Sequence, residues 1–472
     1  MKTLLKKITL TLTLLLTTTT FASIAETYGT NAKTMGMLGG GGATMGGVPA
    51  VYYNVAGLGR SLFSPGNKQR SSVKPVRPVK VLDKTGRKIR IKKDKKTNNY
   101  QSGHAASSAS SNNGIIHQFQ IGYIYGLGSL LETNFNPGTL ENPAVSDTSD
   151  YAISLGLVLD LNAFADLGRS IKFGFSMILP GNGNLIEIDD VSPASHKYLN
   201  FGRSNRGLSI NAGLGGEILK DQLFFGLGAN IIAGGNGAMV LKEIDISPSV
   251  VVPEQQAKVT LQPVVSPTVG LQYHFRQFNF GLSYNHEVVL DMGPIIAQAE
   301  TKLAGIQLQM DIGISDLYSP SKATFSFDYQ VIQKLKMSLD VSMYLWKNYT
   351  LSRVRVAYYE PINFRNTFYP RLGAVYNLLK ELDLYGALGY QMSPVQHRDG
   401  QLNIMDGDRY LASMGARYRL DKIAKMRFPI NFDLSFQYQY MPVIAVTKAD
   451  PTQSYKFGGS IIAVAFSVTN YF

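Results

Sequence analysis

The stretch INFDLSFQYQY, residues 430–440, decides the fold. One face of it carries only apolar and aromatic side chains: Ile430, Phe432, Leu434, Phe436, Tyr438 and Tyr440. The other face carries only polar side chains: Asn431, Asp433, Ser435, Gln437 and Gln439. Because successive side chains of a β-strand point to opposite faces, this alternation predicts a strand with one apolar and one strongly polar face.

The same alternation recurs through most of the chain. It is clear in LKMSLDVSMYLW (residues 335–346) and ATFSFDYQV (residues 323–331). Candidate strands lie near residues 115–130, 148–162, 169–182, 204–219, 221–240, 255–276, 277–293, 318–331, 334–356, 364–378, 381–396, 404–420, 427–447 and 454–472. These are fourteen segments, and an even number of strands is typical of a single-chain outer-membrane barrel.

Two classes of all-β protein have such strands. In an exported soluble sandwich or propeller the apolar face would point to a protein core, whereas in an outer-membrane barrel it points to lipid. Many segments exceed the length of about 5–6 residues that is usual for globular strands, and aromatic residues gather at segment ends. Short connections also alternate with longer ones, as periplasmic turns and external loops do. We therefore predict an all-β fold, in which residues 114–472 form a 14-stranded antiparallel transmembrane β-barrel.

The N-terminus predicts export. Lys2, Lys6 and Lys7 precede an apolar stretch, residues 8–16, and small residues follow at Ser23 and Ala25. We expect residues 1–25 to be a signal peptide that is cleaved after Ala25. The apolar stretch is shorter than the roughly 20 residues of a membrane-spanning helix.

Charge and cysteine content exclude several functions. The chain has no Cys, which excludes disulfides, thiolate metal sites and cysteine nucleophiles. Most of the net charge of +13 lies in residues 68–96, so the rest of the exported chain is nearly neutral and nucleic acid is not an expected partner. We assign residues 61–113 to a basic, then Ser/Ala/Asn-rich, periplasmic insert. It either binds anionic lipid or cell-wall polymer or is a solvated spacer.

Residues 26–60 predict an N-terminal plug (hatch) inside the barrel lumen. A lumen of this size would pass water and salts if nothing blocked it. The glycines at 39–42 and 46–47 permit positive φ and a close approach to the wall. A flexible linker is the alternative, but solvated linkers rarely carry so many Met, Val and Tyr residues.

A family resemblance follows from two stretches. Residues 31–58, NAKTMGMLGGGGATMGGVPAVYYNVAGL, resemble the N-terminal region of the FadL/TodX family of outer-membrane transporters. Residues 389–420 are similar to a second pattern of the family, with matching Ser393, Pro394, Asp406, Asp408, Arg409 and Tyr410. The plug motif Asn-Pro-Ala of the family corresponds to Asn54, Val55 and Ala56, with valine in place of proline.

The resemblance implies a function. The family places a plug before a fourteen-stranded barrel and carries long-chain fatty acids and other hydrophobic compounds. It implies capture at external loops, rearrangement of the plug and sideways exit into the membrane through a kinked strand.

Three sets of residues are candidate sites. Pro180, Gly181 and Gly183 are the candidate lateral gate, because proline and glycine weaken strand pairing; alternatively, Pro180 merely ends the strand. An apolar capture surface, or else a cover of the barrel mouth, consists of Met292, Ile295, Ile296, Leu303 and Ile306. We expect Asp406, Asp408 and Arg409 to form a charge cluster that orders an external loop.

No catalytic or metal-binding motif stands out. The six His residues lack metal-ligand spacing, so we predict no enzyme activity, no cofactor and no metal. The expected partners are a hydrophobic small molecule (fatty acid or hydrocarbon), outer-membrane lipid and the barrel-assembly machinery, which reads apolar C-terminal strands such as the one ending at Phe472. We expect a monomer in the outer membrane of a Gram-negative bacterium. A general porin and a protein-interaction or secretion-accessory barrel are the alternative functions.

Overall fold

The structure, a computed structural model, describes most of the chain between residues 24 and 472. The described residues are 24–60, 116–133, 150–181, 197–199, 201, 208–241, 255–290, 298–299, 301–303, 306–308, 317–348, 364–398, 403–420, 428–450 and 454–472. Residues 1–23 of the expected signal peptide 1–25 and the basic insert 61–113 lie outside them, whereas Ile24 and Ala25, before the expected cleavage position, are described. Of the helices in the described ranges, none is long and apolar enough to cross a membrane.

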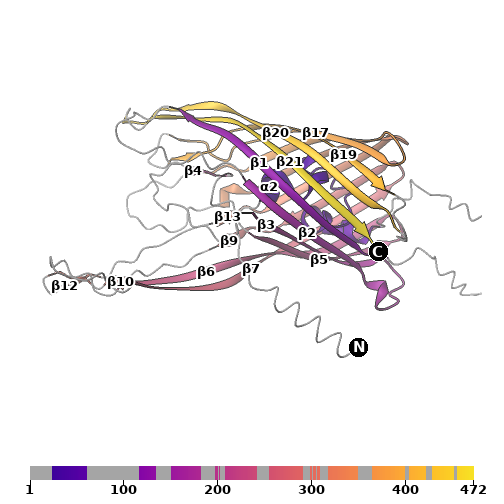
Figure 1. Cartoon of the computed structure of the whole chain (residues 1–472), viewed down its shortest axis with the longest axis horizontal. Helices are drawn as coiled ribbons and strands as arrows, with labels where there is room; N and C mark the ends of the chain where they lie inside the picture. The colour runs from indigo at the N-terminus through magenta and orange to yellow at the C-terminus, as the bar shows by residue number, and fades with distance from the viewer. Residues whose placement is uncertain are drawn as a thin grey trace, which may run out of the picture. The chain divides into compact units, whose positions relative to one another are not determined.

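The described strands form one closed barrel (Figure 1). Its strands are β1 (Gln118–Thr133), β2 (Asp150–Asp160), β3 (Ile171–Pro180), β5 (Ser209–Leu219), β6 (Leu223–Leu241), β7 (Gln255–Phe275), β8 (Phe278–Asn285), β14 (Lys322–Ile332), β15 (Leu335–Tyr344), β16 (Thr367–Asn377), β17 (Leu382–Gln391), β19 (Arg409–Leu420), β20 (Ile430–Val446) and β21 (Tyr455–Tyr471). They follow one another around the sheet, each antiparallel to its neighbours, and the last strand, β21, pairs with β1 to close the barrel. The two-residue strand β10 (Gln298–Ala299) adds to β6 in parallel and brings the sheet to fifteen strands.

Each predicted segment contains one strand of the barrel, so the predicted fold is confirmed. The strand ends differ from the prediction in places. In the segment 334–356, β15 ends at Tyr344 and a 3-10 helix, η6 (Trp346–Asn348), follows it. The Lys347 N–H of this helix donates to Asn366 Oδ1 at 3.0 Å. Residues 349–356 of the segment lie outside the described residues.

The apolar face of the strands points outward. Leu227, Leu388 and Leu434 are 58%, 63% and 56% exposed, whereas Asp433 and Gln437 of the opposite face of β20 are 0% and 2% exposed. A soluble sandwich or propeller would bury the leucines and expose the aspartate. The barrel therefore presents an apolar wall to its surroundings and a polar face to its lumen, as a bilayer requires.

The two ends of the barrel differ. At one end the strands join through tight turns, such as those at Asp221 and Arg276, which both have a φ of 57°. His117 and Phe472 also lie at this end, joined by two backbone hydrogen bonds of 2.8 and 3.1 Å. We call it the short-turn end and the opposite one the long-loop end.

The described parts of the long loops contain short strand pairs. These are β4 (Lys197–Tyr198) with β18 (Ile404–Met405), β9 (Val288–Leu290) with β13 (Leu317–Ser319), and β11 (Thr301–Leu303) with β12 (Ile306–Leu308). On the same side, the β6–β7 pair continues to Leu241↔Gln255, well past the last partners of β5 and β8, and forms the ribbon seen in Figure 1.

Candidate functional site

The N-terminal segment, residues 24–60, packs against the inward face of the barrel (indigo in Figure 1). It contains three short α-helices, α2 (Ile24–Tyr28), α3 (Ala32–Gly36) and α4 (Ala50–Tyr53), and a 3-10 helix, η1 (Val55–Gly59). Asn31 begins α3, since its side chain accepts a hydrogen bond from the Thr34 N–H at 2.9 Å. Helices this short are not stable alone, so contacts with the wall must hold the segment in place.

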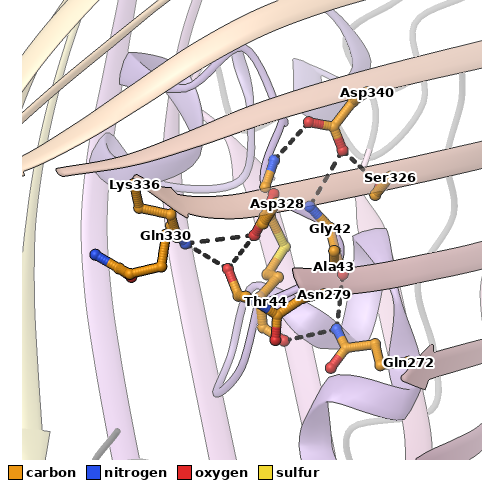
Figure 2. A network of polar contacts seen from close by, with 12 residues as sticks. Gly42, Ala43, Thr44, Gln272, Asn279, Ser326, Asp328, Gln330, Lys336 and Asp340 are labelled. Carbon is orange, nitrogen blue, oxygen red and sulfur yellow. Dashed lines mark hydrogen bonds and ion pairs between the residues drawn. The ribbon is translucent and has the colours of Figure 1, made fainter. Parts of the chain in front are cut away.

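Side chains of the barrel wall form hydrogen bonds with the glycine-rich loop of the segment, residues 39–47 (Figure 2). Asp340 of β15 accepts hydrogen bonds from the N–H groups of Gly41 and Gly42 at 2.7 and 3.2 Å. From the other side of the loop, Gln272 Nε2 of β7 donates to the carbonyl oxygens of Gly42 and Met45 at 2.7 and 3.0 Å. Because hydrogen bonds to a charged acceptor are stronger than neutral ones, Asp340 is the principal anchor of this loop.

A second carboxylate holds a side chain of the same loop. The Thr44 hydroxyl donates to Asp328 of β14, and the Lys336 ammonium of β15 donates to Thr44. Lys336 Nζ also lies 3.4 Å from Asp328 Oδ2. Thr44 is thus clamped between opposite charges that both belong to the wall.

Glu26 of α2 makes the densest contacts with the wall. Lys322 of β14 lies 2.5 Å from its carboxylate, the Tyr344 hydroxyl of β15 donates to it at 3.0 Å, and the Tyr52 hydroxyl donates to it as well. Burial by itself raises the pKa of Glu26, but Lys322 and the two hydroxyls lower it further than burial raises it. Its pKa therefore lies below the ordinary value, and the carboxylate is charged at neutral pH.

The predicted plug motif, Asn54, Val55 and Ala56, packs against glycines of the barrel wall. Asn54 Nδ2 donates to the Leu271 carbonyl at 3.2 Å, and its Oδ1 accepts from the Ala56 N–H at 3.3 Å. A Cβ on Gly226 would lie 2.5 Å from the Val55 carbonyl carbon, and one on Gly270 would lie 2.3 Å from Asn54 Oδ1. The backbone of the motif therefore occupies space that only glycine leaves open.

The inward face becomes apolar toward the long-loop end. Along β21 it changes from Thr469 and Ser467 to Ala465, Ala463 and Ile461, all buried. These apolar residues join α2 and α3 in one cluster, whose members include Ile24, Tyr28, Met35, Ile124, Ile178, Met441, Phe457 and Ile461. Toward the long-loop end the lumen thus holds an apolar cluster, which lies beside the charged pair of Glu26 and Lys322.

A small cavity lies beside the Glu26 anchor. Its lining includes Glu26, Leu38, Lys322, Tyr369 and Arg371, and its volume is about 20 Å³. That is room for about one water molecule. This cavity, in the described part of the chain, is too small for a hydrocarbon chain.

The candidate gate residues lie at the end of a strand. Pro180 is the last residue of β3 and pairs with Ala152, and the Gly181 N–H donates to the Tyr151 carbonyl at 2.7 Å. Gly183 lies outside the described residues. The gate at these positions stays a prediction.

The candidate capture surface lies mostly outside the described residues. This holds for Met292, Ile295 and Ile296, while Leu303 and Ile306 pair with each other across β11 and β12. The capture role stays a prediction.

The three charged loop residues, Asp406, Asp408 and Arg409, contact different partners. Asp408 accepts hydrogen bonds from the Tyr390 hydroxyl at 2.5 Å and the Ser393 N–H at 2.8 Å, and lies 3.8 Å from an Arg365 nitrogen. Arg398 donates to the Asp406 carbonyl at 2.5 Å. The Arg409 guanidinium lies instead over the Phe201 ring, 4.9 Å from its centre. Asp408 and Asp406 thus bind the loop after β17, and Arg409 packs beside them.

Sequence reasoning missed the wall anchors. The sequence shows Asp340, Asp328 and Gln272 only as residues on the polar faces of their strands. The pattern of a single strand does not show which polar residues contact the N-terminal segment. A usable signal does exist, since a carboxylate in the middle of a membrane-spanning strand is expensive and therefore marks a contact in the lumen. Its partner, however, lies hundreds of residues away in the sequence.

The comparisons agree with this architecture. Residues 221–471 match a family model described as outer membrane protein transport protein (OMPP1/FadL/TodX). A solved FadL homologue from Pseudomonas aeruginosa is 14% identical, with a TM-score of 0.51 over 94% of this chain and 98% of that one. The Pseudomonas putida toluene transporter TodX is 12% identical, with a TM-score of 0.43 over 75% of this chain and 90% of that one.

A curated relative matches over a short stretch. Alkane uptake protein A of Marinobacter nauticus is 33% identical over 81 residues, which are 17% of this chain and 18% of the relative. The chain thus spans about a fifth of the length of that relative. Since the family model covers more than half of the sequence, the chain belongs to the FadL/TodX family of outer membrane transport proteins.

Proposed function

We propose that the protein carries long-chain fatty acids or similar hydrophobic compounds passively across the outer membrane, with the N-terminal segment as its plug. The observation that carries this proposal is the contact of residues 24–60 with the lumen, where they are hydrogen-bonded to charged and amide side chains of the wall. The described cavity beside Glu26 holds about one water, and single-channel conductance will test the alternative of an aqueous pore for polar solutes.

The protein resides in the outer membrane of a Gram-negative bacterium, as its family and fold do. The substrate class is a proposal that rests on the family and on the apolar cluster in the lumen. The names of its relatives point to alkanes and toluene for those proteins, so both are test compounds here beside fatty acids.

The proposed mechanism has three steps. External loops capture the compound, the plug rearranges, and the compound leaves sideways into the membrane. The plug anchors are polar contacts that water can replace, so the segment can move without breaking a ladder of the barrel. No nucleotide hydrolysis is needed, because transfer from loop to lipid is driven by burial of apolar surface.

The test is binding and uptake of a radiolabelled long-chain fatty acid, beside an alkane and toluene. Purified protein in detergent reports binding, and outer-membrane vesicles report uptake. Saturable binding together with uptake that depends on residues 26–60 would support the proposal. An absence of binding for all three compounds would refute it and leave the protein-interaction role, which co-purification would then examine. A large steady conductance of the intact protein would favour the porin.

A further inference from the structure

We infer that the short-turn end of the barrel binds an anionic phospholipid, with the lipid phosphate at Arg276 and Lys334 and the acyl chains on the aromatic outer wall beside them. We call this place the headgroup site. The inference goes beyond the proposed function and does not depend on it, because it concerns the lipid around the barrel and not the compound inside it.

The short turns share a pattern of one cation beside apolar side chains. The turns after β2, β5, β7, β14 and β16 belong to the described residues, whereas residues 421–427 after β19 do not. Each of these turns carries one exposed Lys or Arg: Arg169, Lys220, Arg276, Lys334 and Lys380. An exposed apolar side chain lies in each turn or ends the strand before it: Leu167, Leu219, Phe275, Ile332 and Leu379. Such pairs suit the boundary between lipid headgroups and acyl chains, where a long cationic side chain reaches the polar layer.

Two of the turns carry a cation without an acidic residue. The turns after β2, β5 and β16 each contain a carboxylate that offsets the cation: Asp166, Asp221 and Glu381. The turns of Arg276 and Lys334 contain none. Within the described ranges, neither Arg276 nor Lys334 forms an ion pair. Among the described turns, the positive charge is therefore least compensated at these two.

The backbone places these two turns next to each other. β8 pairs with β14 as far as Phe278↔Tyr329, and beyond this pair the Gln330 N–H donates to the Gln277 carbonyl at 3.0 Å. Gln277 directly follows Arg276, and Gln330 lies just before the turn of Lys334. The two cations thus belong to adjacent turns along the rim of the barrel.

The outer wall beside the cations is aromatic. The Arg276 guanidinium lies 5.2 Å from the ring centre of Phe275, a side chain that is 47% exposed. Phe275 stacks with Tyr273 at 6.5 Å between ring centres, and Phe278 stacks with Tyr329 at 5.2 Å. Because Phe275 lies on the lipid-facing face, Arg276 is held at the outer rim and not over the lumen.

An anionic phospholipid matches both parts of the headgroup site. Its phosphate accepts charge-assisted hydrogen bonds from a guanidinium and an ammonium. Its acyl chains bury apolar surface against the rings of β7, β8 and β14. Inorganic phosphate has the charge without the chains. A zwitterionic lipid offsets its phosphate with a cation of its own, so the site should prefer a lipid with net negative charge.

Native mass spectrometry of the whole protein in nonionic detergent can test the site. Dioleoyl phosphatidylglycerol is the probe, dioleoyl phosphatidylcholine has the same chains without net charge, and inorganic phosphate is the competitor. The variant is Arg276→Gln with Lys334→Gln. The matched control, Lys347→Gln with Lys456→Gln, removes two exposed lysines at the long-loop end. Heat-modifiable mobility on gels shows that each variant is folded.

The wild type should prefer phosphatidylglycerol, and the variant should lose that preference. One Lys or Arg near anionic lipid contributes about fivefold in affinity, so the double substitution should weaken phosphatidylglycerol binding about 25-fold. Binding of phosphatidylcholine should not change, and the control should behave as wild type. Equal weakening in the control, or a wild type without preference, would overturn the inference. Displacement of the lipid by inorganic phosphate would also overturn it, because the site would then bind the anion alone.

Salt gives a second measurement that needs no substitution. Charge interactions at a surface are screened by salt, so raising ammonium acetate about tenfold should remove the preference for phosphatidylglycerol in the unmodified protein. A preference that persists at the higher salt concentration would contradict a site built on Arg276 and Lys334.

Discussion

At the scale of single residues, buried charges of the wall bind the N-terminal segment that we propose as the plug. Glu26 shows this most clearly, because one carboxylate meets the ammonium of Lys322 and the hydroxyls of Tyr52 and Tyr344. Removing one partner of such a group leaves the other without compensation.

Acid should therefore release this anchor. The pKa of Glu26 is lowered below its ordinary value of 4.5, so the stabilisation is complete above that pH and is lost as the pH falls through the lower, folded-state value. Conductance in planar bilayers should rise on acidification below pH 4.5. Glu26→Gln should conduct more already at pH 7 and show no such step. The exposed Glu381→Gln is the control and should behave as wild type; a step that survives in Glu26→Gln would contradict the assignment.

We expect a second pH effect at Lys33 of α3. Here the charged form destabilises the folded protein, whereas the charged form of Glu26 stabilises it. The charge of Arg417, burial and the charge of Lys336 lower the pKa of Lys33 to about 7. A lysine whose folded-state pKa is depressed costs stability below that pH, and the cost disappears as the pH rises to 10.5. Lys33→Met should raise the melting temperature at pH 6 and have little effect at pH 10.5. Equal shifts at the two pH values would show that packing, not charge, is responsible.

At the scale of elements, η1 fits the wall because β6 and β7 present glycines beneath it. Gly226→Val would place a side chain where the Val55 backbone lies. We expect a folded barrel with a displaced plug, seen as unchanged heat-modifiable mobility on gels and a higher conductance. Gly216→Ala is the control, since a Cβ at Gly216 meets its nearest neighbour, Ile171, at an ordinary 3.4 Å. A Gly226→Val protein with wild-type conductance would mean that the motif can shift without opening the lumen.

The candidate gate is tested at the same scale. Pro180 ends β3, where it pairs with Ala152. Pro180→Ala should reduce uptake without unfolding the barrel if this strand end is the gate. Unchanged uptake in a well-folded variant would remove Pro180 from the mechanism.

At the scale of the whole molecule, the barrel should not need its plug to assemble. The wall is a continuous ladder, closed by β21 with β1, and the N-terminal segment contributes no strand to it. Deletion of residues 26–60 should therefore leave a heat-modifiable barrel with a large, steady conductance and without plug-dependent uptake. A deletion variant that aggregates would show that the segment is needed for folding as well.

The sequence by itself determined the class of fold, the number of strands and the outward direction of the apolar face. Alternation is a local property, and the stretch 430–440 displays it without reference to any other part of the chain. The sequence also predicted that residues 26–60 pack against the barrel instead of forming a solvated linker, because they combine glycines with many apolar residues; their role as a plug stays a prediction.

Only the tertiary structure decided which residues meet in the lumen. Asp340 and Gly41 are 299 residues apart, and no pattern in either segment predicts their hydrogen bond. Glu26 and Lys322 are likewise 296 residues apart, so their ion pair appears only when the N-terminal segment lies against the wall. Contacts across a closed barrel depend on strand order and register, which arise only when the wall is complete.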